Sequence, residues 1–116
     1  MKVLVTCGPT WVPIDAVRVI SNHSTGEMGR LIAAAFVKAG AKVRVLEGPM
    51  SFDDFARKFK AACTKKYDIV VHAAAVSDFK LKTAAKGKLS SGKTLNLRLV
   101  PKIGRASCRE RVCQYV

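Results

Sequence analysis

The sequence predicts an α/β fold built on a parallel β-sheet, and three observations support this prediction. Short apolar runs typical of buried strands occur at residues 2–7, 42–46 and 68–74. Two segments with helical periodicity separate these runs. The connections that follow the helical segments are short, as in β-α-β units with right-handed crossovers.

The first strand is followed by an irregular segment and then a helix. Residues 8–24 contain glycine, proline and asparagine, so we expect mostly loop there, with a short helical turn at 14–19. The first helix is predicted over 25–39, capped at its start by Ser24 or Thr25 and ended by Gly40. Its apolar positions are Met28, Leu31, Ile32, Ala35, Phe36 and Ala39.

The second half repeats the strand–helix alternation. After the strand at 42–46, a second helix is predicted near 52–65, and the strand at 68–74 is apolar throughout. The expected architecture is a Rossmann-like three-layer sandwich whose parallel sheet has the strand order 2-1-3. Residues 80–93 are lysine-rich and predicted to be a mobile loop, and 94–100 alternate as a half-exposed strand does.

The last segment, residues 102–116, shows neither helical nor strand periodicity. Residues 102–112 resemble the translation of a common sequencing adapter. We therefore expect a native region over 1–101, truncated relative to a complete domain, and a disordered, non-native tail over 102–116. The alternative is a native basic tail that binds nucleic acid.

The composition constrains the partners. The chain has 116 residues and a formal net charge of +13, which favours nucleic acid, phosphorylated small molecules or anionic membranes as partners. The apolar runs are too short to cross a bilayer, and the start of the chain lacks the features of a secretory signal. We expect a cytoplasmic protein. The four cysteines form no Cys-x-x-Cys pair, and no metal site is predicted.

A phosphate-binding turn is the first candidate site. The first strand ends at Gly8, and Ser24, Gly26 and Gly29 surround the predicted helix start. Glycines let the backbone approach a phosphate, and free N–H groups at a helix N-terminus attract negative charge. The intervening loop is too long for the G-x-G-x-x-G pattern. On spacing alone, tight packing of the helix on the strand is an equal alternative.

Further polar residues follow the strands at the carboxyl edge of the sheet, where open α/β folds bind ligands. Asn22 could hydrogen-bond a carbonyl or an oxyanion, although local chemistry favours an Asx-turn or a helix-entry cap. Ala74 and Ala75 would let a flat ligand lie against the backbone. Asp78 could accept from a ribose, an amine or a metal-bound water, or cap a turn. Glu47 occupies the position of a ribose-binding acid in dinucleotide folds.

The lysine-rich loop offers a possible phosphate clamp. Its lysines are Lys80, Lys82, Lys86, Lys88 and Lys93. Most of them are expected to be solvated, and Lys88 lies deepest in the loop sequence.

Two blocks of sequence together resemble one enzyme family. Thr6–Thr10 and Ile20–Gly26 closely resemble the opening of phosphopantothenate–cysteine ligase, the synthetase domain of coenzyme A biosynthesis. Ala73–Phe79 resembles the "AAVADY" stretch of that family, and Lys88 falls where the family has a lysine run. The resemblance covers about residues 2–101. It implies the N-terminal half of the ligase domain, which in bacteria is often fused behind a flavin-dependent decarboxylase.

The family reaction implies specific ligands. A nucleoside triphosphate, CTP in most bacteria and ATP in eukaryotes, activates the carboxylate of 4′-phosphopantothenate as an acyl-nucleotide. The amine of cysteine then displaces the nucleotide. Mg²⁺ would bridge triphosphate oxygens, and FMN would belong to the decarboxylase rather than to this domain. The full-length protein would be a homodimer, and a chain of this length is expected to have little activity alone.

The resemblance also assigns roles to residues. Asn22 would contact the acyl-nucleotide, and Lys88 would meet the triphosphate or the developing negative charge. Gly8, Ser24, Gly26 and Gly29 would shape the phosphate-facing turn, and Ala74, Ala75 and Asp78 would line the base and ribose site. Three features depart from the family pattern. Trp11-Val12 replaces Arg-Glu, Glu27 replaces a lysine, and the lysine run is reduced to Lys88.

Two alternatives remain at this point. Glu47 and the strand at 68–74 would suit an NAD(P)-dependent oxidoreductase of the short-chain dehydrogenase type, but no Tyr-x-x-x-Lys pair is present. The positive charge would suit a basic nucleic-acid-binding module, although Phe79 is the only aromatic near the lysine-rich loop.

Overall fold

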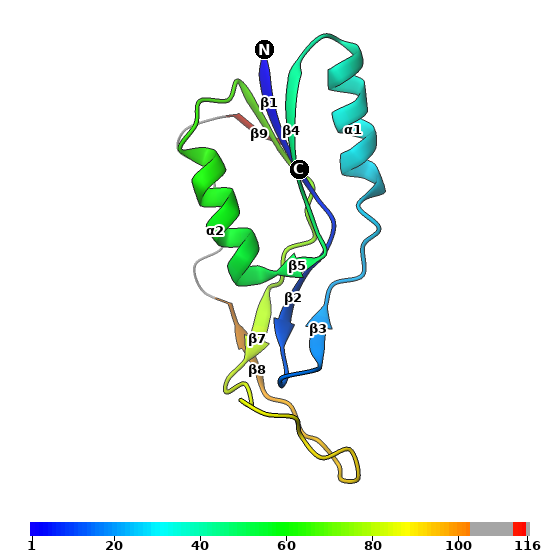
Figure 1. Cartoon of the computed structure of the whole chain (residues 1–116), viewed down its shortest axis with the longest axis vertical. Helices are drawn as coiled ribbons and strands as arrows, with labels where there is room; N and C mark the ends of the chain where they lie inside the picture. Colours follow the sequence, from blue (N-terminus) through cyan, green and yellow to red (C-terminus); the bar gives the residue numbers. More distant parts are fainter. Residues whose placement is uncertain (103–112, 116) are drawn as a thin grey trace.

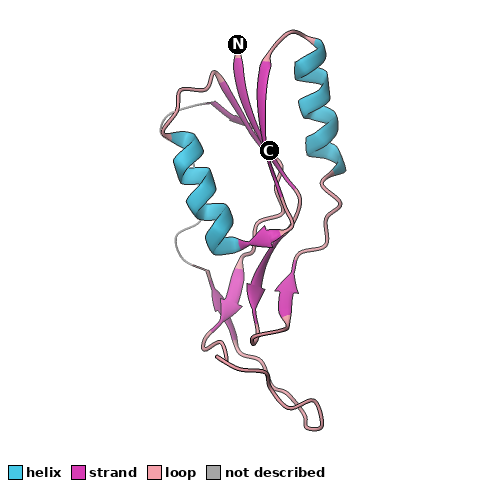
Figure 2. Cartoon of the chain, in the orientation of Figure 1, coloured by secondary structure: helices cyan, strands magenta, loops and turns pink. Residues whose placement is uncertain are grey.

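The computed structural model describes residues 1–102 and 113–115, and the backbone alone for 113–115. Its central sheet has the strand order β4-β1-β6-β9, with all strands parallel. The sheet lies between two helices, one on each side (Figures 1 and 2). The elements of this body are β1 (Lys2–Cys7), α1 (Glu27–Lys38), β4 (Lys42–Glu47), α2 (Phe52–Cys63), β6 (Ile69–His72) and β9 (Cys113–Tyr115). The predicted α/β fold and strand order are confirmed.

The core has two halves because successive residues of β1 point to opposite faces of the sheet. Leu4 packs with Phe55 and Phe59 of α2 in one cluster. Val3 and Val5 pack with Ala33 of α1 in the other. A strand buried on both faces must be apolar at consecutive positions, and this is why β1 has no polar alternation.

Helix α1 ends as the sequence predicts but turns a different stripe inward. Gly40 has a φ of 91°, and its N–H donates to the carbonyl of Val37, as in a Schellman motif. Gly29 and Ala33 are the buried residues of the helix. Met28 and Leu31, expected in the stripe, are 71% and 64% exposed.

Gly29 explains this rotation. A Cβ built on Gly29 would lie 2.2 Å from the Cβ of Cys7 and 3.2 Å from the carbonyl oxygen of Thr6. The helix therefore approaches β1 more closely than any side chain at this position permits. The face of α1 that carries Gly29 must then turn toward the sheet, which leaves Met28 and Leu31 outside.

The segment predicted as loop with a helical turn is instead a β-hairpin. β2 (Thr10–Pro13) pairs antiparallel with β3 (Val19–Ser21) and parallel with β5 (Met50–Ser51). The prediction of a helical turn is wrong because the Asp15 carboxylate accepts hydrogen bonds from the main-chain N–H groups of Val17 and Arg18, 2.9 and 2.8 Å away. These bonds close a tight turn and compete with helix formation.

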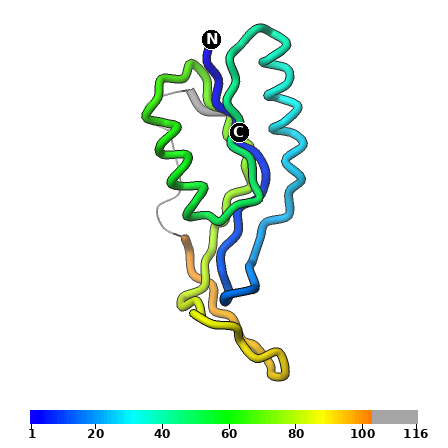
Figure 3. Tube along the Cα trace, viewed as in Figure 1, coloured from blue at the N-terminus to red at the C-terminus, as the bar shows by residue number. Residues whose placement is uncertain are grey.

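A small ribbon extends the molecule. β7 (Phe79–Leu81) pairs antiparallel with β8 (Leu99–Pro101), so the strand predicted over 94–100 is shorter and lies later. The intervening residues 82–98 project away from the sheet (Figure 3). The extents of 55 × 26 × 19 Å and the radius of gyration of 16.3 Å reflect this projection, since a compact chain of this length has a radius of about 13 Å.

One short part of the tail lies within the described residues, and the disorder expected for the tail stays a prediction. Cys113–Tyr115 forms β9 beside β6. Residues 103–112 and 116 lie outside the described residues, and the non-native origin of the tail stays a prediction. Within the described ranges, neither helix has the length and apolarity needed to span a bilayer.

Substitution of Gly29 by alanine tests the close helix–strand contact. We expect Gly29→Ala to lower the free energy of unfolding by about 1–3 kcal/mol, since the added Cβ overlaps Cys7. The matched control is Gly87→Ala, where an added Cβ meets nothing within 4 Å, and a change within about 0.5 kcal/mol is expected. Equal urea midpoints for the two variants would contradict the argument.

Candidate functional site

Three backbone segments meet at the carboxyl ends of β1 and β4. Gly8, just after β1, has a φ of 84°, and a Cβ there would lie 2.9 Å from the amide nitrogen of Gly48. Gly26, the N-cap of α1, has a φ of 74°, and its Cβ would lie 3.2 Å from the amide nitrogen of Gly8. Both glycines therefore adopt a conformation and a contact that side chains disfavour. The predicted turn brings Gly8 and Gly26 together.

Two of the other predicted residues of this turn have defined local roles. The hydroxyl of Ser24 accepts a hydrogen bond of 3.2 Å from the N–H of Gly26, so Ser24 orders the approach to the helix without being its N-cap. Gly29 packs on Cys7. Gly29 therefore has the role of close helix–strand packing, which was one of the two alternatives from the sequence. Its part in binding a phosphate stays a prediction.

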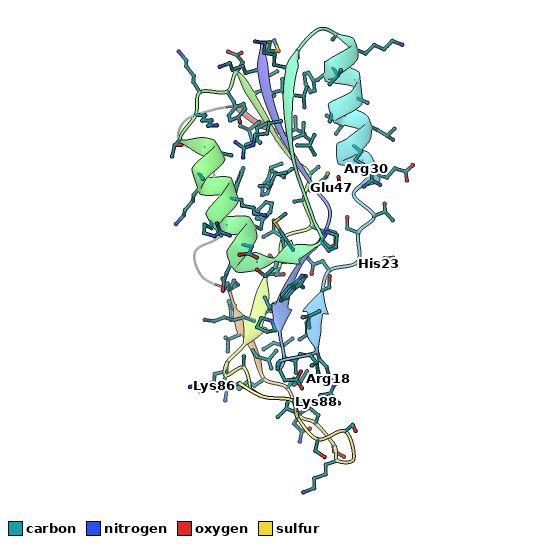
Figure 4. The ribbon with its side chains drawn as sticks, viewed as in Figure 1. Arg18, His23, Arg30, Glu47, Lys86 and Lys88 are labelled. Carbon is teal, nitrogen blue, oxygen red and sulfur yellow. The ribbon has the colours of Figure 1, made fainter. Side chains whose placement is uncertain are left out.

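Arg30 is a cation at this turn that the sequence reasoning missed. Its guanidinium Nη1 lies 3.1 Å from the position that a Cβ on Gly26 would take, and it forms an ion pair with Glu47 of β4 (Figure 4). The hydrogen bond that the Arg30 guanidinium donates to the Glu47 carboxylate raises the pKa of Arg30 above its ordinary value. The signal in the sequence was the spacing of four residues between Gly26 and Arg30, which places both at one end of one helix face.

Asn22 joins the hairpin to the segment that follows β6. Its side-chain amide Nδ2 donates to the carbonyl oxygens of Ala75 and Val76, at 3.1 and 3.0 Å. Ala75 in turn donates its N–H to the carbonyl of Gly8 at 3.0 Å. The structure therefore brings Asn22 and Ala75 next to the glycine turn. The contacts of Asn22 differ from an Asx-turn or helix cap, and its side-chain Oδ1 takes no part in the two bonds to carbonyls.

Two buried threonines hold the same segment, and sequence reasoning missed them as well. The hydroxyl of Thr10 contacts the hydroxyl of Ser77 at 2.8 Å and accepts from the N–H of Ser77 at 2.8 Å. The hydroxyl of Thr6 accepts from the N–H of Ala74 at 3.3 Å. Asp78, an exposed residue, follows directly after this anchored stretch. Ala74, Ala75 and Asp78 are thereby placed along one edge of the sheet, as predicted from the order of the strands.

Lys88 lies elsewhere in the molecule. Figure 4 shows it beside Arg18, near the tip of the β2–β3 hairpin and well away from Arg30 and Glu47. The neighbouring Leu89 is held there because its N–H donates to Asp15 at 2.9 Å and its carbonyl accepts from Arg18 at 3.2 Å. The structure does not bring Lys88 to the glycine turn.

Asp15 is the centre of this second arrangement. The carboxylate is buried and forms an ion pair of 2.5 Å with Arg18. The N–H of Leu89, followed by that of Val17, lowers the pKa of Asp15 to about 2. Main-chain bonds from Ala85 to Ile14 and from Ala16 to Gly87 add to the attachment. The first half of the loop predicted to be mobile is thus hydrogen-bonded to the hairpin turn.

The described residues offer few groups for covalent or metal chemistry. Cys7 lies behind Gly29, and its burial, followed by the charge of Glu47, raises the pKa of its thiol. A protonated, buried thiol is a poor nucleophile. Among residues 1–102, no three His, Cys, Asp or Glu side chains gather as a metal site. The site therefore suits binding through backbone N–H groups, amides and cations.

The comparisons with known proteins agree with this geometry. The family model of the DNA/pantothenate metabolism flavoprotein C-terminal domain matches residues 1–105. This chain belongs to that family. The match includes the glycine turn, Asn22, the Ala74–Asp78 segment and Lys88.

Curated relatives of this family member share about a third or more of its residues. The coenzyme A biosynthesis bifunctional protein CoaBC of Escherichia coli is 33% identical over 117 residues, covering 86% of this chain and 29% of that protein. The CoaBC protein of Thermococcus kodakarensis is 40% identical over 114 residues, covering 86% of this chain and 28% of that protein. The chain thus spans less than a third of the length of these relatives.

Solved structures of the family have the same fold. The C-terminal domain of a CoaBC protein matches with a TM-score of 0.70 and 27% identity, over 89% of this chain and 54% of that chain. The DNA/pantothenate metabolism flavoprotein from Streptococcus pneumoniae matches with a TM-score of 0.74 and 26% identity, over 90% and 62%. A Cab2 mutant in complex with phosphopantothenate-cysteine, at 20% identity and a TM-score of 0.70, shows the fold alone.

Titration tests the Asp15 attachment. The free energy of unfolding of the parent should exceed that of Asp15→Asn by its full amount above pH 3.8, the ordinary carboxyl pKa. This difference should be lost as the pH falls toward about 2, because the hydrogen bonds of the folded chain favour the ionised carboxylate. Urea unfolding of both proteins at several pH values measures this difference. As a control, Asp53→Asn removes a carboxylate that is 84% exposed, so its effect should stay within about 0.5 kcal/mol at every pH. A difference for Asp15 that is independent of pH would contradict the role of its ionised carboxylate.

Proposed function

We propose that this chain supplies the nucleotide-binding part of a phosphopantothenate–cysteine ligase of coenzyme A biosynthesis. The observation that carries the proposal is the match of the family model over residues 1–105, which includes the glycine turn and the Asn22–Ala75 contact. The complex of Cab2 with phosphopantothenate-cysteine supports the substrate, as a member of the same fold. The substrates proposed are 4′-phosphopantothenate, cysteine and a nucleoside triphosphate, CTP or ATP.

The proposed reaction has two displacements. A carboxylate oxygen of phosphopantothenate attacks the α-phosphorus of the triphosphate, and pyrophosphate leaves. The amine of cysteine then attacks the acyl carbon, the amide bond forms, the acyl–oxygen bond breaks and the nucleoside monophosphate leaves with the electron pair of that bond. The amine loses a proton to solvent. Neither displacement needs a protein nucleophile, in accord with the buried thiol of Cys7.

The turn is suited to the triphosphate. Gly8 and Gly26 are both buried, because the backbone of Gly26 packs against Gly8 and that of Gly8 against Gly48, and Ser24 fixes the start of α1. The N-terminal end of α1 and the guanidinium of Arg30 provide positive potential there. Arg30 compensates for Glu27, which stands where the family has lysine. We assign Arg30 to the phosphate group and Glu47 to its orientation.

The remaining assignments follow the edge of the sheet. Asn22 is anchored on Ala75 and Val76, and its Nδ2 would leave these carbonyls to donate to the acyl-nucleotide. Ala74, Ala75 and Asp78 would line the base and ribose. Lys88, attached to the hairpin through Leu89, would serve the triphosphate only after a movement of residues 82–98 or from another copy of the chain. A homodimer is accordingly part of the proposal.

Mg²⁺ would be held by the nucleotide itself. No cluster of three acidic, histidine or cysteine side chains exists within residues 1–102, and Mg²⁺ commonly binds through substrate phosphates and one or two carboxylates. Asp78 is an exposed carboxylate on the predicted nucleotide edge. The ion would neutralise charge on the triphosphate. FMN has no proposed site in this chain, and a flavin-dependent decarboxylase is proposed as a linked activity, since the relatives are bifunctional. The cytoplasm is the proposed location.

The alternatives from the sequence receive no support. Glu47 is paired with Arg30, a contact that competes with the ribose contact of a dinucleotide-binding acid. The family match assigns the lysine-rich loop to an enzyme domain rather than to a nucleic-acid-binding module.

A chimaera tests the proposal, because the chain spans 54% of a solved domain and is expected to release little pyrophosphate alone. Residues 1–101 would replace the matching segment of the Escherichia coli relative. We expect pyrophosphate release that requires phosphopantothenate, Mg²⁺ and CTP or ATP, and amide formation on adding cysteine. A folded chimaera that releases none with either nucleotide would refute the proposal.

Asn22→Ala in the chimaera tests the assigned role. We expect a loss of about 10²–10³-fold in pyrophosphate release, the range for a donor that stabilises developing charge. Asn96→Ala is the matched control, since Asn96 is exposed in the loop, and its rate should stay near that of the parent. Equal rates for Asn22→Ala and Asn96→Ala in folded proteins would remove Asn22 from the mechanism.

A further inference from the structure

A basic pocket lies at the amino-terminal edge of the central sheet, at the opposite end of β1 from the glycine turn. Three segments that are distant in the sequence line it: the start of β1, the start of β4 and the connection from α2 to β6, which meet near the N-terminus in Figure 1. The cavity measures about 240 Å³. Its lining residues are Lys2, Lys42, Val43, Arg44, Lys65, Lys66 and Tyr67.

The register of the sheet places these cations together. Lys2 of β1 is the direct partner of Lys42 of β4 in the parallel ladder. Lys42 and Arg44 alternate with Val43, so both project to the face of Leu46, which packs in the core beneath α2. Helix α2 ends at Cys63 and leaves this corner of the face uncovered. Lys65 and Lys66 close the corner from the other side.

No ion pair among residues 1–102 neutralises the side chains of the pocket cations. The ion pairs of residues 1–102 join Arg18 to Asp15, Arg30 to Glu47, Arg57 to Asp54 and Lys102 to Asp53, so they include none of the five pocket cations. The nearby carboxylate of Asp68 accepts from the main-chain N–H of Lys2 at 2.7 Å. Cations gathered around one concavity repel one another and focus a positive potential into it.

The frame of the pocket is rigid. The N–H of Lys42 donates to the carbonyl of Met1 at 2.9 Å, and the N–H of Asp68 donates to the carbonyl of Lys2 at 2.8 Å. Tyr67, at 9% exposure, anchors the third segment in the core. The backbones that carry the cations are therefore held at fixed spacing before any ligand arrives, which lowers the entropy cost of binding.

We propose that this pocket binds a multiply charged phosphate anion of the pyrophosphate class. Ammonium groups and a guanidinium fork are the groups that recognise phosphate oxygens. A cavity of about 240 Å³ admits a diphosphate or the phosphate end of a small molecule. Binding relieves the repulsion among the five cations and so stabilises the folded chain. This site is separate from the nucleotide site, because it lies at the other end of the strands.

Calorimetric titration of the whole chain with inorganic pyrophosphate tests the proposal. Saturable binding is expected, together with a rise in melting temperature beyond that caused by sodium chloride of equal ionic strength. The double variant Lys42→Gln/Lys65→Gln should weaken binding by at least about tenfold, and Lys42→Arg/Lys65→Arg should retain most of it. The matched control, Lys86→Gln/Lys93→Gln, removes the same charge from the exposed loop and should bind as the parent does.

Four outcomes would overturn the proposal. The first is that the parent chain shows no saturable binding. The second is that the control variant binds as weakly as the pocket variant, which would mean that net charge alone determines the affinity. The third is that Arg30→Gln abolishes binding whereas the pocket variant still binds, which would place the anion at the glycine turn. The fourth is that a short single-stranded DNA, at equal phosphate concentration, binds more tightly than pyrophosphate and displaces it. The pocket would then be part of a nucleic-acid-binding surface.

Discussion

The contact of α1 with the end of β1 is the constraint on which the rest of the molecule depends. Gly29 lets the helix rest on Cys7, and Gly26 lets the helix start touch Gly8. No larger residue fits these positions without moving backbone. The same contact determines which face of α1 is buried and how Arg30 reaches Gly26.

The three-stranded sheet of β3, β2 and β5 is attached to the rest of the molecule by side-chain hydrogen bonds. Asn22 and Thr10 fasten the hairpin to the segment after β6, and Asp15 closes its turn and holds the following loop. Each is a short polar side chain that satisfies main-chain groups outside the ladders. The edge that we propose as the ligand site is therefore assembled from residues far apart in sequence, and its geometry depends on these few bonds.

The excess of positive charge is distributed unevenly. Some cations are in ion pairs, as in Arg18 with Asp15 and Arg30 with Glu47. Residues 82–98 project away from the sheet (Figure 3), and the lysines that they carry are exposed. The cations at the amino-terminal edge of the sheet form no ion pair with another of residues 1–102, and they lie together around one pocket. Within residues 1–102, the positive charge that contributes to the net charge of +13 thus falls into three different situations.

The sequence by itself determined the α/β class, the order of the three main strands, the helix end at Gly40 and the glycine turn. These follow from local periodicity and from residues whose conformational properties act at their own positions. Tertiary structure alone decided the rest. The rotation of α1, the hairpin closed by Asp15, the pairing of Arg30 and the separation of Lys88 from the turn depend on contacts between distant segments. Periodicity carries no information about such contacts, because it records one element at a time.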